Sequence, residues 1–126
     1  MYKKADSWII LLRSSPMRGG IEMEFDEYQT EARKTAVYPP DVGLQYTTLG
    51  LAGEAGEVAN KVKKVLRGDG AIDKNAIQGE LGDVLWYISN LATELGISMD
   101  DIAKENLAKL RDRMARGVLK GSGDNR

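Results

Sequence analysis

The sequence predicts an all-α fold, an antiparallel helical bundle of about four main helices that associates into oligomers. Two observations support this class. Apolar residues recur at intervals of three and four in four successive stretches, and no stretch shows the strict alternation of a half-buried strand. The connections between the stretches are short, which favours antiparallel neighbours.

The first two helices are bounded by proline, aspartate and glycine. Residues 25–38 form the first predicted helix, which stops at Pro39 and Pro40 because proline cannot continue a helix. Asp41 is the predicted N-cap of a long second helix, and Gly68 ends that helix.

Two further helices follow. Asp73 is the predicted N-cap of the third, and Gly96 occupies the position after its end that favours glycine. Ser98 opens a fourth helix that ends near Gly117. Its residues predicted to face inward are Ile102, Leu107 and Leu110.

The chain divides into a helical domain and two flanking segments. The predicted domain covers residues 23–117, with a poorly ordered extension over residues 1–22 and a glycine-rich tail over residues 118–126. The apolar run at residues 8–12 is too short for a membrane span or the core of a signal peptide. We therefore expect a cytoplasmic protein with no membrane partner.

Composition narrows the possible chemistry. The formal net charge is -1, so no overall field draws the protein to a nucleic acid polymer. Cysteine and histidine are both absent, which excludes disulfides, histidine-based triads and the common zinc sites. Catalysis would depend on carboxylates, lysine, tyrosine, serine or a metal ion held by oxygen ligands.

An unusual pentapeptide pattern occurs twice. Residues 53–57 read GEAGE and residues 79–83 read GELGD, and both lie within predicted helices. Glycine inside a helix costs roughly 1 kcal/mol relative to alanine, so a pattern that places four glycines there calls for a functional explanation. We interpret them as removing bulk beside each acid, so that ions, water and phosphate can approach the backbone.

The spacing of the four acids predicts that they converge. At about 100° per residue, each acid lies at the edge of the apolar stripe of its helix. Folding the second and third helices together at residues 68–71 brings the acids to about the same depth, roughly 15 Å from the turn. Such a cluster favours a hard divalent cation, Mg²⁺ with Mn²⁺ as the alternative. The acids are Glu54, Glu57, Glu80 and Asp83.

The pair E-x-x-E, followed after 22 residues by E-x-x-D, resembles the signature of the MazG-like all-α nucleotide pyrophosphohydrolases. The resemblance covers roughly residues 24–123 and includes the runs GLAGEAGEV, ELGDVLWYI and NLAKLRDR. It implies an oligomeric bundle that binds Mg²⁺ and hydrolyses a (deoxy)nucleoside triphosphate to the monophosphate and pyrophosphate. Family members often carry a further glutamate where this chain has Gly53, so the number of ions stays open.

We assign roles to the site residues as hypotheses. Glu54, Glu57 and Asp83 are predicted to ligate metal, and Glu80 either ligates or accepts the proton of the attacking water. The resemblance implies that Tyr87 faces the nucleotide and that Asn106 and Lys109 reach its sugar or phosphates. Lys61 is near enough to compensate phosphate charge, although an ordinary ion pair on the helix surface explains it equally well.

Two other functions remain open. One is a non-enzymatic helical module whose acids bind a cation or face a basic partner, and the other is a phosphoribosyl-ATP pyrophosphohydrolase with similar acids. Whichever function holds, the sequence predicts a homodimer or homotetramer. The prediction depends on the apolar stripes and on a small-residue edge at Gly50, Gly53 and Gly56.

Overall fold

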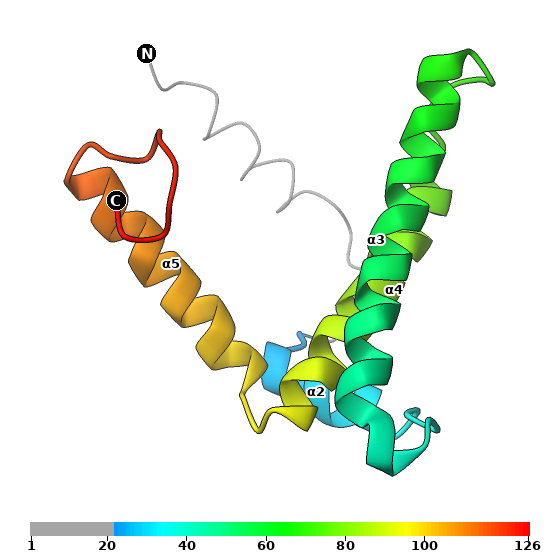
Figure 1. Ribbon diagram of the computed structural model, residues 1–126, viewed down its shortest axis with the longest axis horizontal. Coiled ribbons are helices and arrows are strands. Elements are labelled where there is room, and N and C mark those ends of the chain that lie inside the picture. The colour runs from blue at the N-terminus through cyan, green and yellow to red at the C-terminus, as the bar shows by residue number, and fades with distance from the viewer. Residues whose placement is uncertain (1–21) are drawn as a thin grey trace.

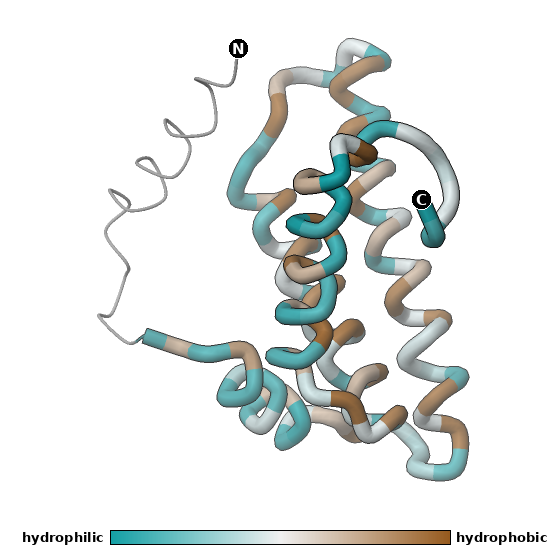
Figure 2. Tube along the Cα trace, turned by 90° about the vertical axis from the view of Figure 1, so that its left-hand side faces the viewer, coloured by the Kyte–Doolittle hydropathy of each residue, from teal (hydrophilic) through white to brown (hydrophobic). Residues whose placement is uncertain are grey.

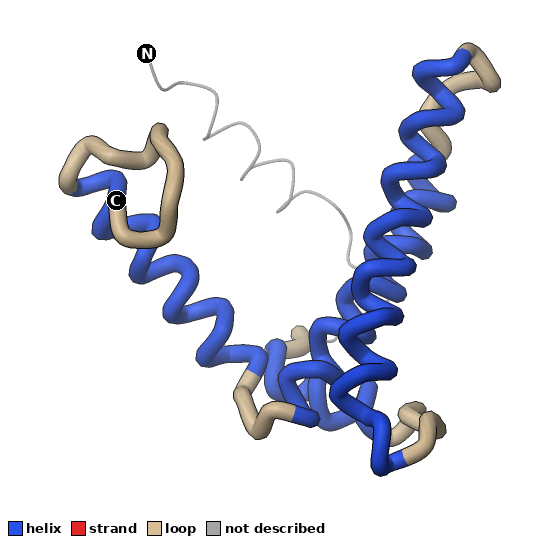
Figure 3. The backbone as a smooth tube through the Cα atoms, in the orientation of Figure 1, coloured by secondary structure: helices blue, strands red, loops and turns tan. Residues whose placement is uncertain are grey.

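The computed structural model describes residues 22–126, so the predicted extension over residues 1–22 lies almost entirely outside the described residues. The described chain is helical and contains no strand, which confirms the all-α class (Figure 3). Its elements are α2 (Phe25–Arg33), the 3₁₀ turn η1 (Pro40–Val42), α3 (Gly43–Arg67), α4 (Lys74–Glu94) and α5 (Met99–Ala115).

The long helices α3 and α4 form an antiparallel hairpin (Figure 1). Gly68 ends α3 with a φ of 96°, in the left-handed region that glycine adopts without a β-carbon penalty. Asp73 then caps α4, because its side chain accepts hydrogen bonds from the backbone N–H groups of Asn75 and Ala76. The predicted turn and cap are confirmed.

The first helix is shorter than predicted. It ends at Arg33 rather than at residue 38, and residues 34–39 form a turn and a loop. Pro39 restricts Tyr38 to extended backbone conformations, so a helix reaching Tyr38 is disfavoured. The Tyr38 side chain instead donates a hydrogen bond to Glu94 at the end of α4.

The predicted cap of α3 is wrong. Asp41 lies inside the 3₁₀ turn η1, and the residue that precedes the helix is Val42, whose side chain makes no capping hydrogen bond. The adjacent prolines explain the difference. Proline is well suited to the first position of a helical turn, so the turn begins at Pro40, one residue before Asp41.

Helix α2 lies across the base of the hairpin and fixes the start of α5 (Figure 1). Gln29 donates to the carbonyl of Ile97 over 2.9 Å and accepts from the backbone N–H of Met99 over 2.8 Å. Ser98, the confirmed N-cap of α5, donates to Asp26 over 2.7 Å. The junction between α4 and α5 is therefore held by side chains of α2.

Helix α5 packs on α2 and diverges from the hairpin, so the two arms form an open angle (Figure 1). The residues predicted to face inward, Ile102, Leu107 and Leu110, are 39%, 49% and 40% exposed, and this prediction is wrong for a single chain. Periodicity identified an apolar stripe on α5, but the described chain does not cover it.

The C-terminal tail folds back along the end of α5 (Figure 3). Arg113 is buried and donates to the carbonyl of Asp124 over 2.7 Å, and Arg116 donates to the carbonyl of Arg126 over 2.8 Å. The arginine side chains give this glycine-rich segment defined contacts. Among the described residues, none of the helices combines the length and apolar character that crossing a bilayer requires.

Candidate metal centre

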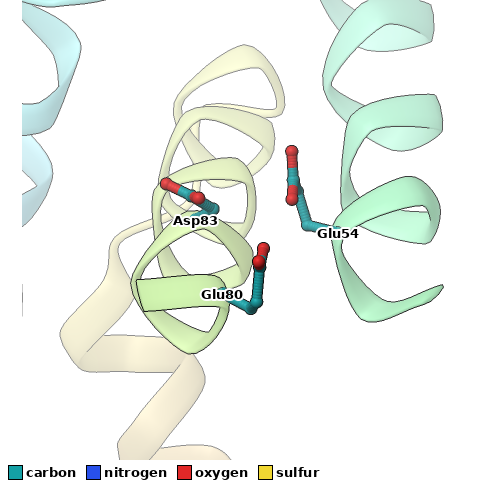
Figure 4. A group of neighbouring side chains, drawn as sticks. All are labelled: Glu54, Glu80 and Asp83. Atoms are coloured by element: carbon teal, nitrogen blue, oxygen red, sulfur yellow. The ribbon is translucent and has the colours of Figure 1, made fainter. Parts of the chain in front are cut away.

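Three carboxylates meet between α3 and α4. One oxygen from each of Glu54, Glu80 and Asp83 lies within 4.8 Å of the other two (Figure 4). Glu54 comes from α3, whereas Glu80 and Asp83 lie one turn apart on α4. The group therefore depends on the hairpin, which brings together residues that are 26 and 29 positions apart in the sequence.

The charges of this cluster disfavour ionisation of Glu54. Partial burial raises the pKa of Glu54 above its ordinary value, and the negative charges of Asp83, Glu80 and Glu57 raise it further. A cation placed among these oxygens would relieve the repulsion, because it favours the charged form of every carboxylate.

Glu57 lies outside this group of three. It is exposed, whereas Glu54 is half-buried, and a spacing of three residues turns the two side chains about 60° apart on a helix. Its charge nevertheless reaches Glu54. Its predicted role as a metal ligand stays a prediction.

Lys61 forms an ion pair across the hairpin. Its ammonium nitrogen lies 3.1 Å from a carboxylate oxygen of Glu80, and both side chains are partly shielded from solvent. Glu57 lies four residues before Lys61 on the same helix, but the ion pair forms with Glu80 across the hairpin. The fold thus places one basic group directly beside the carboxylate cluster.

Tyr87 lies at the edge of the cluster, against α3. Burial raises its pKa, as do its neighbour Tyr46 and the charges of Glu54 and Asp83. A β-carbon at Gly50 would overlap with the Tyr87 ring. The ring can therefore reach this position only because residue 50 is glycine, a role distinct from the predicted oligomer edge.

The glycines of the two pentapeptides behave differently from Gly50. A β-carbon added at any of them would meet no side chain and no other helix within 4 Å. The described chain leaves open space beside each one. These glycines are Gly53, Gly56, Gly79 and Gly82.

The other large aromatic of α4 has a structural contact. Trp86 donates a hydrogen bond from its indole nitrogen to Thr35 over 2.7 Å, and its ring meets Tyr38 edge-on with centroids 6.4 Å apart. It anchors the loop after α2 to α4. Adjacent helix positions point about 100° apart, which explains why Trp86 and Tyr87 have different neighbours.

Sequence reasoning missed Tyr28 as a neighbour of the acids. It lies in the predicted first helix, and both burial and the nearby charge of Asp83 raise its pKa. Tyr28 also lines a cavity of about 560 Å³ between α2, α4 and α5. The cavity is lined by Met23, Glu24, Phe25, Tyr28, Leu85, Asp100 and Lys104. No local pattern in α2 identifies this role, because α2 and α4 are distant in sequence.

Asn106 and Lys109 do not join the cluster within one chain. Both are exposed and lie on the part of α5 that diverges from the hairpin (Figure 1). Neither side chain forms a hydrogen bond or an ion pair within residues 22–126. Their predicted contact with the nucleotide stays a prediction.

The donor set fits a magnesium ion. All three members are carboxylates, the ligand type that Mg²⁺ prefers, and with bonds of about 2.1 Å, opposite oxygens in an octahedral shell lie about 4.2 Å apart. The oxygens here span up to 4.8 Å, so only small side-chain rotations are needed. Water or other oxygen ligands would complete the shell.

Two comparisons with known proteins give a match to this chain. A family model described as MazG nucleotide pyrophosphohydrolase domain matches residues 43–117, which include all four acids. The chain is also 49% identical over 114 residues to the Gene 37 protein of Mycobacterium phage L5, an alignment that covers 82% of this chain and 100% of that protein. No solved structure matches the chain.

Proposed function

Because this chain belongs to the MazG nucleotide pyrophosphohydrolase family, we propose that it hydrolyses a (deoxy)nucleoside triphosphate to the monophosphate and pyrophosphate in the cytoplasm, with Mg²⁺ or Mn²⁺ as cofactor. The observation that carries the proposal is the convergence of Glu54, Glu80 and Asp83 within 4.8 Å. Mutual repulsion disfavours three ionised carboxylates at this distance, and a bound cation would relieve it.

In this proposal the three clustered acids hold the ion, and Glu57, one turn along α3, is the fourth acid of the site. The bound ion would neutralise phosphate charge and lower the pKa of coordinated water. Water attacks the α-phosphorus while the bond between that phosphorus and the bridging oxygen to the β-phosphate breaks. In the alternative assignment, Glu80 does not ligate the ion and accepts the proton of the attacking water instead.

Lys61 and Tyr87 have defined places beside the phosphates in this proposal. Lys61 pairs with Glu80 in the free protein and can turn its ammonium group to a phosphate oxygen when substrate binds. Burial and the nearby charge of Glu54 both raise the pKa of Tyr87, so its hydroxyl stays protonated and can donate to the nucleotide. Both groups position the substrate without being consumed in the reaction.

The cavity beside Tyr28 suits the nucleoside part of the substrate. Its volume of about 560 Å³ lies within the range typical of small-molecule sites. Phe25 and Tyr28 offer aromatic surface to a base, and Lys104 offers a donor. Tyr28 lines this cavity and lies close enough to Asp83 for that charge, after burial, to raise its pKa, which supports a phosphate site next to the cavity.

Association into a homodimer or homotetramer is part of the proposal. Among residues 22–126, only Ala32, Ala92 and Met99 are buried apolar residues, whereas 18 large apolar side chains are at least 36% exposed. A domain of this size normally buries about two-thirds of the surface of its unfolded chain. Contact between copies would supply the burial that one chain lacks.

Pyrophosphate release tests the proposal directly. Purified protein is incubated with Mg²⁺ and a panel of NTPs, dNTPs and phosphoribosyl-ATP, with Asp83→Asn as the control. We expect turnover of at least one nucleoside triphosphate and none by the variant. Exclusive turnover of phosphoribosyl-ATP would replace the substrate class, and a folded wild type inactive on every compound would favour a non-enzymatic module.

A further inference from the structure

Lys61 supplies a positive charge to the carboxylate cluster of the hairpin. Its ammonium nitrogen lies 3.1 Å from Glu80, one of the three acids whose oxygens lie within 4.8 Å of one another. The Lys61 side chain is 34% exposed and that of Glu80 is 19% exposed, so solvent screens this pair less than a pair on an open surface. One member of the proposed ion site is therefore already paired with a cation that belongs to the chain.

The direction of helical side chains explains how Lys61 reaches Glu80. Counted from Gly50 along α3, Lys61 lies 11 residues toward the turn that joins the two helices. Counted from Tyr87, which packs on Gly50, Glu80 lies seven residues toward that turn. Lys61 is therefore about 6 Å nearer the turn. Every Cα–Cβ bond tilts toward the N-terminus of its helix, so on these antiparallel helices the two side chains lean toward each other.

Lys61 shares the face of α3 that carries Glu54. The two residues are seven positions apart, so their directions around the helix axis differ by only about 20°. Lys63 is nine positions from Glu54, points about 180° away from it and is exposed. Helix α3 thus directs one lysine toward the carboxylates and a second, close in sequence, away from them.

The surroundings of the cluster strengthen the effect of this charge. Glu54 and Glu80 are half-buried, and hydrophobic residues alternate with hydrophilic ones along the helices of the hairpin (Figure 2). Water screens charges less in such a place than in open solution. Like charges a few ångström apart disfavour ionisation, whereas a nearby cation favours the charged form of each carboxylate. The ammonium group of Lys61 therefore offsets part of the repulsion within the cluster.

We propose that Lys61 is an internal counterion that competes with Mg²⁺ for Glu80, so that the metal ion and a phosphate ligand bind cooperatively. In the free protein Lys61 neutralises part of the cluster. A metal ion on the Glu80 oxygen displaces the ammonium group, which then needs another negative partner. The cooperativity rests on the proposed function for its phosphate ligand, whereas the competition for Glu80 does not depend on turnover.

Phosphate is a better new partner for Lys61 than the remaining acid on its own helix. Glu57 lies four residues before Lys61, the spacing and order of a favourable helical ion pair. Glu57 is exposed, however, so solvent screens that pair and it replaces only part of the contact with Glu80. A phosphate chain bound to the metal ion would bring several anionic oxygens to the displaced ammonium group. By linkage, the phosphate ligand then tightens binding of the ion and the ion tightens binding of the phosphate ligand.

Isothermal calorimetry with Mg²⁺ alone tests the competition. Lys61→Met keeps the apolar stem and removes the ammonium group, and Lys63→Met removes the same charge from the opposite face of α3. We expect Lys61→Met to bind Mg²⁺ about three- to tenfold more tightly than the wild type, and Lys63→Met to bind it about as tightly as the wild type. Equal affinities of wild type and Lys61→Met, equal gains in both variants, or no uptake of Mg²⁺ by any of the three proteins would overturn the proposal.

A conservative variant and a stability measurement separate charge from packing. Lys61→Arg keeps the positive charge, so it should restore the wild-type affinity for Mg²⁺. In EDTA, Lys61→Met should melt at a lower temperature than Lys63→Met, and Mg²⁺ should raise its melting temperature more than that of the wild type. A Lys61→Arg protein that binds Mg²⁺ as tightly as Lys61→Met would contradict the counterion role, as would equal melting temperatures of the two methionine variants in EDTA.

Inorganic triphosphate tests the cooperativity, because it supplies a phosphate chain without a choice of base. Calorimetry with its magnesium complex should show weaker binding to Lys61→Met than to the wild type. The variant would then gain affinity for Mg²⁺ alone and lose affinity for the complex. A purely structural role of Lys61 would weaken both, so two changes in the same direction would contradict the proposal.

The outcomes separate this proposal from the proposed reaction. A wild type that releases no pyrophosphate from any nucleotide, together with tighter Mg²⁺ binding by Lys61→Met, would leave the competition standing and remove the reaction. An active wild type whose affinity for Mg²⁺ is unchanged by Lys61→Met would do the reverse.

Discussion

The hairpin and α5 contrast within one short chain. In the hairpin, α3 and α4 pack against each other, Lys61 pairs with Glu80, and Gly50 accepts the ring of Tyr87. Helix α5 is equally well formed locally, with a confirmed cap at Ser98, yet its apolar stripe faces no described neighbour. The difference shows that caps and periodicity define where a helix begins and ends, whereas burial of its apolar face requires a neighbouring element.

The largest expected effect concerns the carboxylates of the hairpin. Glu54→Gln keeps the size of the side chain and removes a ligand charge, so pyrophosphate release should fall roughly 100- to 1,000-fold, the scale of losing a group that stabilises developing charge. Glu57→Gln should cost less, because Glu57 lies outside the group of three. Isothermal calorimetry with Mg²⁺ measures the matching loss of binding.

Equal losses in the two variants would mean that Glu57 moves to the ion when substrate binds. A Glu54→Gln enzyme with undiminished turnover would remove the cluster from the reaction and leave the hairpin with a structural role only.

Gly50 and Gly53 allow a matched test of packing inside the hairpin. Gly50→Ala forces the Tyr87 ring away and should destabilise the fold by about 1 to 3 kcal/mol, the usual cost of overpacking. Gly53→Ala meets open space and should stabilise it by roughly 0.5 to 1 kcal/mol through helix propensity. Urea denaturation monitored by circular dichroism measures both changes, and two changes of the same sign would contradict the placement of Tyr87.

The caps of α4 and α5 compare the two regions directly. Asp73→Ala removes the cap of α4 and should cost about 1 kcal/mol. Ser98→Ala should cost more, because Ser98 both caps α5 and donates to Asp26 on α2. Thermal denaturation of the two variants at one protein concentration makes the comparison, and a smaller loss for Ser98→Ala would show that the α5 junction adds no stability.

The smallest effect is the pH dependence of the contact between α4 and α2. Hydrogen bonds from Tyr38 and Arg33 lower the pKa of Glu94 in the folded protein. A carboxylate with a lowered folded pKa stabilises the fold above its unfolded pKa, and this contribution is lost as pH falls through the folded pKa. The melting temperature of the wild type should therefore drop more steeply below about pH 4.5 than that of Glu94→Gln.

Parallel curves for wild type and Glu94→Gln would show that the bonds to Glu94 do not survive in solution. The contact between α2 and the end of α4 would then depend on Gln29 and its bonds to Ile97 and Met99.

The sequence was sufficient for the helical class and for the helix ends that depend on local chemistry. Asp73, Gly96 and Ser98 act through backbone groups within a few residues, so their roles follow from residue type and position. The predicted cap at Asp41 is wrong for a reason that is also local, because the neighbouring prolines start the turn one residue earlier.

Sequence spacing also predicted that acids from two helices converge, and three of them do. The spacing of residues along a helix fixes the direction of each side chain around the helix axis. The short turn after Gly68 fixes which residues of α3 lie opposite which residues of α4, because both helices rise by about 1.5 Å per residue from that turn. The pairing of Lys61 with Glu80, the close contact of Tyr87 with Gly50 and the position of Tyr28 beside Asp83 were decided only by tertiary structure. These contacts depend on the rotation of one helix against another, which the side chains of both helices determine together.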